Sequence, residues 1–480
     1  MSGKSIKKNY IYNISYQLLV LAAPLITTPY VSRVLGAVGV GTYSFASSIV
    51  AYFTMFAGMG TAAYGQREIS YVQDDKEKRT DVFWNTEILS CISTIVCLFL
   101  YGVFILFFCD NIMIYSIFAM NIIAVAFDIT WLFQGMEEFG YIVARNTFFK
   151  VLNITYIFFF VKSRNDLAFY VLGMCLFPFL GMISLWTTLH RIVDKPDWKK
   201  VKPFINIRSV FSMFIPFIAI SIYTVLDKTM IGVFTDVKNE NGYYEQAIKL
   251  SKTALTLVTA LGTVMTSRIG YYYEKQAMDI LKKYIYRSYR FVWFLGVPLC
   301  FGLMGVSTNL VPWFYGEGFE KVVPLLVILS LLIPIIGISN VTGMQYMVPT
   351  KRQNILTITV LIGAIVNFVS NLILIPEWYS IGAALTSVFA EIIITAVQII
   401  VMRKELCPKK IILCGRHYWL AGFVMFVVLY KMGKCLTPSI IHSVIMIISG
   451  SIVYFVLLLF LKDDFFLQQL KYILQKLKWR

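Results

Sequence analysis

Several charged side chains stand inside long apolar runs of this sequence, where an ionisable group is costly and by default faces a cavity or a partner. A cavity with surplus positive charge suits an anionic substrate, and a diphosphate is a natural partner for arginine and lysine at close range. The runs hold more bases than acids. We predict the bases as substrate-binding residues, namely Arg33, Lys150, Lys228, Lys249 and Lys252.

The spacing of these residues adds detail to the prediction. Lys150 follows Asn146 by four residues and precedes Asn153 by three, which puts the three on one face of a helix. Lys249 and Lys252 are three residues apart and project to the same side of their helix. For each lysine taken singly, the alternative is a snorkelling side chain or an internal ion pair.

The acids in the same runs are Asp128, Asp227 and Glu391. An acid in such a setting could titrate and so couple transport to protons, and all three are candidates for that role. Asp227 is adjacent to Lys228 and is more simply interpreted as its ion-pair partner. Asp128 is predicted to share a helix face with Trp131.

The elements that must position these residues are predicted to be membrane helices. Of 480 residues, 58% are hydrophobic and only 14% are charged, whereas a soluble domain carries about a quarter charged residues. Hydropathy indicates an all-α polytopic membrane protein of about fourteen spans. The segments are 12–34, 41–64, 84–108, 112–133, 142–161, 167–189, 209–234, 246–268, 288–310, 322–345, 353–375, 380–402, 417–433 and 440–461.

The basic residues indicate the orientation of these spans. With the N-terminus inside, 32 of the 43 lysines and arginines fall in cytoplasmic parts and 6 in external loops. This asymmetry is what the positive-inside rule demands, and it places both termini in the cytoplasm. The net charge of +17 therefore reflects topology and favours anionic membrane lipids rather than nucleic acid.

A weak internal repeat relates the two halves. The first and seventh spans each carry a mid-span proline (Pro24, Pro216), which we predict as hinges. Each also has a charge near its outer end and a G-x-Y sequence opening the next span. Such a parallel repeat predicts two pseudo-symmetric six-helix lobes around a central cavity. The predicted divisions are an N-terminal lobe (1–190), a basic linker (191–208), a C-terminal lobe (209–402) and two further helices with a basic tail (403–480).

Several classes of site have no motif in this sequence. No CxxC pair occurs among the eight cysteines and only three histidines are present, so we expect no metal site. Nucleotide-binding and hydrolase motifs are missing as well, and no loop is long enough for a separate catalytic domain. We expect a transporter without a cofactor rather than an enzyme.

At PYVSRVLGAVGVGTYSFA, followed by GMGTAAYGQREIS, the sequence resembles polysaccharide flippases of the Wzx type. These belong to the polysaccharide transport family within the multidrug/oligosaccharidyl-lipid/polysaccharide exporter superfamily. WLFQGMEEF, LDKTMIG, GYYEQAIKL, NFVSNLILIP and IGAALTSVFAE look like further family landmarks, so the resemblance covers the first twelve spans. One departure from the family pattern is TSRIGYYYE (266–274), where relatives often have a proline just after the arginine and this sequence has Ile269 and Gly270.

The resemblance implies alternating access and an undecaprenyl-diphosphate-linked oligosaccharide cargo, moved from the cytoplasmic to the outer leaflet for surface polysaccharide synthesis. It also implies a bacterial cytoplasmic membrane and, as partners, a polymerase and glycosyltransferases. Arg33 stands where family members have a cationic cavity residue. The alternatives with the same fold are a lipid II flippase and a small-molecule antiporter. A polysaccharide polymerase or glycosyltransferase is a further alternative, which would be expected to carry a sizeable external loop or an acidic DxD-like site.

Overall fold

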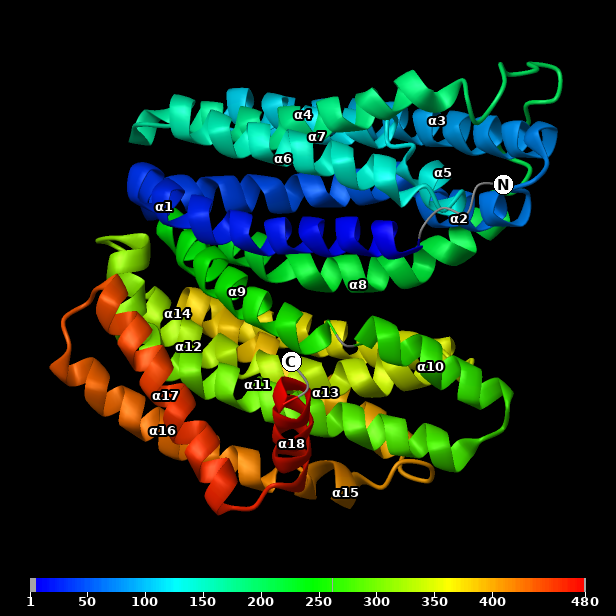
Figure 1. Ribbon diagram of the computed structural model, residues 1–480. Coiled ribbons are helices and arrows are strands. Elements are labelled where there is room, and N and C mark those ends of the chain that lie inside the picture. Colours follow the sequence, from blue (N-terminus) through cyan, green and yellow to red (C-terminus); the bar gives the residue numbers. More distant parts are fainter. Residues whose placement is uncertain (1–5, 261, 479–480) are drawn as a thin grey trace. The chain divides into compact units, whose positions relative to one another are not determined.

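The computed structural model describes residues 6–260 and 262–478, and within these ranges the chain forms helices, turns and irregular connections but no strand (Figure 1). The chain divides into two compact units, residues 1–229 and 230–480. The predicted all-helical polytopic fold is confirmed. The predicted divisions at 190, 208 and 402 stay predictions.

The first unit is built from seven helices, a short 3₁₀ turn and most of an eighth helix. In chain order they are α1 (Ile6–Gly58), α2 (Thr61–Tyr71), α3 (Lys76–Phe108), α4 (Ile112–Val125), α5 (Thr130–Gly135), α6 (Phe139–Phe160), η1 (Arg164–Asp166), α7 (Leu167–Leu189) and α8 (Ile207–Phe234).

Two glycines shape the first long helix and its end. α1 runs through the first two predicted spans, and its one non-helical residue is Gly36, with a φ of 67°. Pro24 lies inside α1 without interrupting it, and the side chain of Pro216, in α8, falls outside the described residues. Gly60, with a φ of 80°, separates α1 from α2, and a Cβ there would stand 3.1 Å from the Val210 carbonyl oxygen. Only glycine adopts this conformation without strain, so it permits the close approach of α8.

Apolar packing holds the first unit together. α1 packs on α3, α4 and α6, and α7 packs on α4 and α6. A second buried cluster joins α2, α3 and α5, in which the rings of Phe83 and Trp131 stack with centroids 5.5 Å apart. Asp75 begins α3 by accepting a hydrogen bond from the backbone N–H of Lys78 (3.1 Å), which satisfies one of the free donors at the helix start.

The second unit holds the remaining helices, which follow in the order α9 (Lys238–Thr259), α10 (Gly262–Glu274), α11 (Met278–Tyr315), α12 (Val322–Ser330), α13 (Leu332–Asn340), the π-helical turn η2 (Val341–Met347), α14 (Gln353–Val401), α15 (Pro408–Leu413), α16 (Arg416–Cys435), α17 (Ile440–Phe460) and α18 (Asp464–Lys478).

α14 covers two predicted spans and is broken between them. Tyr379 has a φ of 53°, which is rare for a residue with a side chain, and it follows Pro376 by three residues. The buried carboxylate of Glu240, on α9, accepts hydrogen bonds from the backbone N–H and the hydroxyl of Ser380 (3.2 and 2.5 Å). The same carboxylate pairs with Lys321 at 2.6 Å. Glu240 therefore fixes the break in α14 by satisfying the groups that the interrupted helix leaves free.

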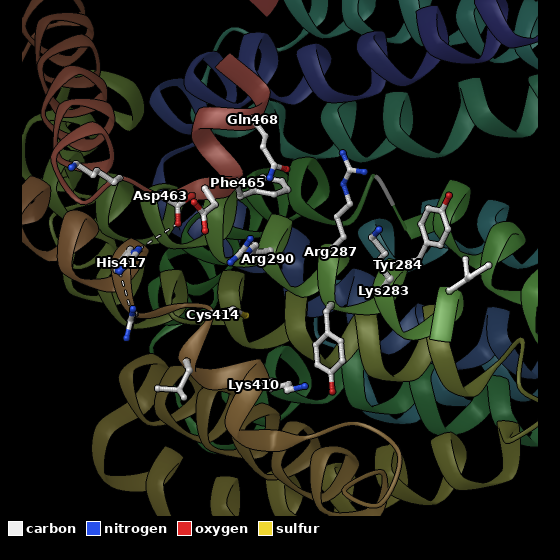
Figure 2. Close-up of a pocket in the computed structure, with 16 residues that line it drawn as sticks. Lys283, Tyr284, Arg287, Arg290, Lys410, Cys414, His417, Asp463, Phe465 and Gln468 are labelled. Carbon is white, nitrogen blue, oxygen red and sulfur yellow. Dashed lines mark hydrogen bonds and ion pairs between the residues drawn. The ribbon is translucent and has the colours of Figure 1, made fainter. Parts of the chain in front are cut away.

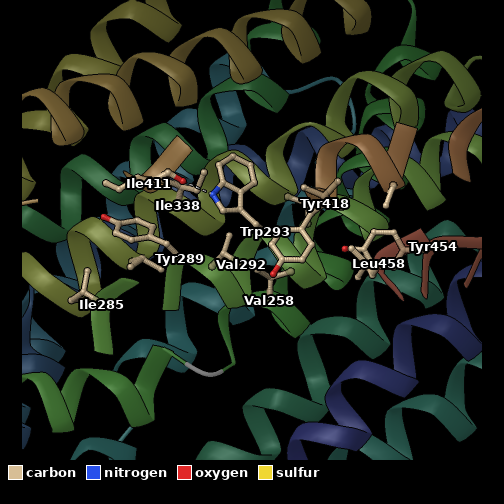
Figure 3. Packing of buried hydrophobic residues seen from close by; sticks show 14 of the residues in the cluster. Val258, Ile285, Tyr289, Val292, Trp293, Ile338, Ile411, Tyr418, Tyr454 and Leu458 are labelled. Atoms are coloured by element: carbon tan, nitrogen blue, oxygen red, sulfur yellow. Dashed lines mark hydrogen bonds between the residues drawn. The ribbon is translucent and has the colours of Figure 1, made fainter. Parts of the chain in front are cut away.

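The core of the second unit centres on α11 (Figure 3). The indole N–H of Trp293 donates to the Ile411 carbonyl (2.8 Å), and the hydroxyl of Tyr454 donates to the Phe294 carbonyl (2.9 Å). Gly305 faces Leu429 so closely that a Cβ would stand 2.6 Å from it. Small residues let membrane helices approach each other in this way, so α16 and α17 are integral parts of this unit.

Large apolar side chains on the outside fit a lipid environment. Phe107, Ile441 and Phe460 are 77%, 67% and 79% exposed, which would be costly in water over so wide a surface. Within the described residues, nine helical stretches are long and apolar enough to cross a membrane, and two of them, of 50 and 49 residues, each cover two predicted spans. The chain is a multi-pass membrane protein, and fourteen spans stays the predicted number.

Candidate functional site

Lys150 has the best-defined surroundings of the predicted cations. It lies half-buried on α6 and lines a cavity of about 200 Å³ between α6 and α7, together with Asn146 and Asn153. The predicted shared face is thus present. Phe149 and Phe177 complete much of the wall. Within the described part of the chain, the Lys150 amine makes no hydrogen bond or ion pair, so its charge is available to a ligand.

A neighbouring cation on the same helix, Arg145, forms hydrogen bonds within the first unit. The Arg145 guanidinium donates to the Asn146 side-chain oxygen at 2.9 and 2.6 Å and to the Thr130 hydroxyl at 3.3 Å. The Asn153 amide donates to the Gly173 carbonyl at 2.6 Å. These bonds tie α6 to α5 and α7 and hold the wall on which Lys150 stands.

Arg33 and Lys228 occupy corresponding positions in the two copies of the predicted repeat. Arg33 is exposed on α1, three residues before the break at Gly36. Lys228 is half-buried near the end of α8, beside the buried Asp227. The hydroxyl of the next residue, Thr229, lies within hydrogen-bond distance of the Ser48 and Tyr52 hydroxyls of α1, at 3.0 and 3.2 Å. A polar contact therefore links the end of α8 to α1 inside the first unit.

Asp128 lies beside a second cavity of the first unit. This cavity, of about 470 Å³, is lined by Asp128, Trp131 and Asn121 with parts of α1, α2, α3 and α8. The prediction that Asp128 lies on a helix face is wrong, because the chain turns between α4 and α5 at this residue. Its carboxylate accepts the backbone N–H of Thr130 (3.0 Å), a local bond that favours a turn over a continuous helix.

The remaining predicted residues belong to the second unit. Lys249 is half-buried and Lys252 is exposed on α9, and Glu391 is buried on α14. α9 and α14 pack against each other. The cations and acids thus occur in both compact units, three cations in the first and two in the second.

A family model described as "Polysaccharide biosynthesis protein" matches residues 6–269, more than half of the chain. The chain belongs to this family. It is similar to proteins named "Putative O-antigen transporter" from Escherichia coli K12 and Shigella dysenteriae. The first is 23% identical over 85% of this chain and 99% of its own length, and the second is 24% identical over 77% and 93%.

Solved structures of membrane transporters share the fold of this family member. A lipid II flippase, MurJ, in an inward closed conformation aligns with a TM-score of 0.75 at 16% identity, over 95% of this chain and 100% of its own. An inward-facing multidrug resistance transporter of the MATE family, within the MOP superfamily, aligns with a TM-score of 0.62 at 14% identity, over 88% and 99%.

These findings confirm the predicted resemblance and the expectation of a transporter rather than an enzyme. They establish to which class of protein the chain belongs. The roles of the individual cations, acids and prolines stay predictions.

Sequence reasoning missed a buried acid in the first unit. Glu87 on α3 is 2% exposed, and its Oε1 atom has no hydrogen-bond partner among the described residues. It lies close enough to Asp128 for the two carboxyl groups to interact electrostatically. Glu87 stands near the start of the predicted span 84–108, where a charge is tolerated at the membrane surface, so its position gave only a weak signal.

A buried polar cluster in α14 was missed as well. The Asn371 amide donates to the Asn367 side-chain oxygen at 3.2 Å, and the Thr386 hydroxyl donates to Asn371. The three residues come from both sides of the break in α14. Neutral amides and hydroxyls in apolar runs gave no charge signal, although the pairing of two asparagines four residues apart could have indicated one helix face.

Proposed function

We propose that this protein moves undecaprenyl-diphosphate-linked oligosaccharide repeat units from the cytoplasmic to the outer leaflet of a bacterial cytoplasmic membrane, for the synthesis of a surface polysaccharide. The observation that carries the proposal is the membership of the polysaccharide biosynthesis family, with relatives named as O-antigen transporters that align over nearly their whole length. The excess of basic residues on one side of the spans supports cytoplasmic termini.

The electrostatics of the first unit support an anionic cargo. Lys150 brings a half-buried amine to a cavity wall on which asparagine side chains offer further polar groups. A diphosphate carries charged oxygens that accept short, strong hydrogen bonds from ammonium and guanidinium groups. Arg33 and Lys228 in the first unit, with Lys249 and Lys252 in the second, would extend this chemistry to each unit, as alternating access between two lobes requires.

Buried and half-buried carboxyl groups support coupling to protons. Glu87 is 2% exposed, and its carboxyl group interacts electrostatically with that of Asp128, which lines the cavity of about 470 Å³. In the proposed cycle, protonation of this pair changes the charge that the first unit presents and so favours one of two conformations. Asp227 and Glu391 are the other candidates.

A strain that lacks the gene provides the test. We expect lipid-linked repeat units to accumulate on the cytoplasmic leaflet, where a membrane-impermeant reagent such as periodate does not oxidise their sugars in intact spheroplasts. Restoring the gene should make the sugars reactive and restore surface polysaccharide. Repeat units that reach the outer leaflet at the normal rate without the gene would contradict the proposal.

The same strain separates the proposal from its closest alternative. A lipid II flippase would also meet a diphosphate, so the cationic residues do not discriminate between the two cargoes. We expect lipid II to remain distributed as in the parent strain, with normal growth. Accumulation of lipid II on the cytoplasmic leaflet would instead assign the protein to peptidoglycan synthesis.

A further inference from the structure

A large basic pocket lies in the second unit, and none of the predicted site residues is among those that line it (Figure 2). It has a volume of about 1080 Å³ and is bounded by the first turns of α11, by α15 and the start of α16, and by the corner between α17 and α18. The basic side chains that line it are Lys283, Arg287, Arg290, Lys410, Arg416 and Lys462.

Among the residues that the structure describes, only Asp463 and Asp464 bring carboxylates to the same pocket, and Asp463 is already engaged. Asp463 is 4% exposed and accepts hydrogen bonds from the Tyr418 hydroxyl (2.9 Å) and the Phe466 backbone N–H (3.0 Å). His417 approaches it at 3.5 Å. These contacts fix the corner between α17 and α18, so Asp463 shapes the pocket.

The cations that α11 contributes to the pocket make no such hydrogen bonds or ion pairs within the described part of the chain. Lys283 and Arg287 are exposed one turn apart on α11, and Arg290 is half-buried one turn further along. None of the three forms an ion pair with any residue that the structure describes. Their spacing places them on one helix face, and Figure 2 shows all three among the side chains that line the pocket. Because like charges at this spacing repel each other, the arrangement favours a bound anion.

The surroundings of the pocket indicate what kind of anion fits. It lies at the ends of three apolar helices, α11, α16 and α17, where a membrane surface would meet the protein. Ile280, Leu413 and Phe465 line it beside the basic groups. α18, which closes one side, is strongly amphipathic, as is typical of helices that lie in the plane of a membrane interface. An apolar rim beside clustered bases suits a ligand with a charged head and a hydrocarbon body.

We propose that this pocket binds the phosphate-bearing headgroup of an anionic membrane lipid. Lys283, Arg287 and Arg290 contact the phosphate, and the apolar rim contacts the start of the acyl chains. The site is separate from the cations proposed to hold the cargo, and its existence does not depend on what the protein transports.

The test uses the purified full-length protein in a neutral detergent, titrated with short-chain phosphatidylglycerol, short-chain phosphatidylcholine and inorganic pyrophosphate. Binding is measured by the shift of the thermal unfolding midpoint. The test variant is Lys283→Gln/Arg287→Gln, which removes two exposed charges. The matched control is Arg403→Gln/Lys404→Gln, which removes two exposed charges that follow α14 and do not line the pocket. Circular dichroism checks that both variants keep the helix content of the wild type.

We expect the wild type to bind phosphatidylglycerol at least about tenfold more tightly than phosphatidylcholine, because only the former leaves a net negative charge for the bases. The test variant should lose about tenfold or more in affinity for phosphatidylglycerol, since charge-assisted hydrogen bonds are lost. The control should stay within about twofold of the wild type. Equal effects in the two variants would overturn the site. Pyrophosphate that binds as tightly as phosphatidylglycerol would overturn the lipid as its occupant.

Discussion

Replacing Lys150 by methionine should make the protein more stable and a worse transporter. The amine is half-buried beside Phe149 and Phe177 and has no partner within the described residues. A lysine at the centre of a membrane helix costs about 2.5–3.5 kcal/mol. Because Lys150 is only half-buried, we expect Lys150→Met to raise the free energy of unfolding by about 1–2 kcal/mol. Methionine keeps the length of the chain, so packing changes little.

The same substitution should weaken binding of an anionic cargo. A hydrogen bond from a charged donor contributes about 1.5–3 kcal/mol, which corresponds to a loss of about tenfold to one hundredfold in affinity. Thermal unfolding in detergent measures the first effect, and transport into the outer leaflet at limiting cargo measures the second. Lys150→Arg, which keeps the charge, should retain most of the transport.

Arg145→Met is the matched control on the same helix. Its guanidinium bonds the Asn146 and Thr130 side chains, so its removal leaves acceptors without a donor and should lower stability by about 1–3 kcal/mol. If Lys150→Met raises the stability and Arg145→Met lowers it, Lys150 is a cation kept for binding, whereas Arg145 is one that stabilises the fold. If Lys150→Met lowered the unfolding midpoint as Arg145→Met does, or left transport unchanged, the assignment of Lys150 would be refuted.

Three further outcomes follow from the geometry. Burial raises the pKa of Glu405, but hydrogen bonds from Tyr346 and Arg352 and the charge of Arg352 outweigh it and hold the pKa below its usual 4.5. Arg352→Gln should therefore lower the free energy of unfolding by about 1–2 kcal/mol at pH 7. In unfolding scans, this difference from the wild type should shrink as the pH falls below about 4.5 and Glu405 becomes protonated. Gly60→Ala should lower the unfolding midpoint because Gly60 has a positive φ and its added Cβ would meet the Val210 carbonyl. Gly102→Ala, whose added Cβ would have no neighbouring atom within 4 Å, should leave the midpoint unchanged or raise it. Equal shifts of the midpoint in the two variants would contradict this. Glu87→Gln should keep the fold but make transport in vesicles less dependent on an imposed pH gradient, and an unchanged dependence would remove Glu87 from the coupling pair.

Much of the fold could be predicted because hydrophobic length is a strong signal in a membrane protein. Each of the fourteen predicted segments lies mainly on helix. α1 holds two of them and breaks at Gly36, inside the gap of 35–40 that the prediction left between the two spans. That the break falls at this residue could not be predicted, because neither glycine nor proline by itself specifies whether a helix bends. The break in α14 depends on Glu240, which is distant in sequence.

The candidate site was predictable only in part. The shared face of Lys150, Asn146 and Asn153 follows from helical spacing, and the three do line one cavity. Glu87 on α3 and Asp128 in the turn between α4 and α5 are about forty residues apart in sequence, so no local pattern could pair them. The basic pocket of the second unit is assembled from three separate stretches of the chain, whose lysines and arginines had only indicated topology.

The most direct test of the account is transport by Arg33→Ala and Lys249→Ala variants, one from each compact unit, expressed at wild-type levels in a strain that lacks the native gene. We expect both variants to leave lipid-linked repeat units on the cytoplasmic leaflet and to reduce surface polysaccharide strongly, because the diphosphate loses a cationic partner in one unit. Full surface polysaccharide with both variants would contradict the claim that cations within the spans hold the cargo.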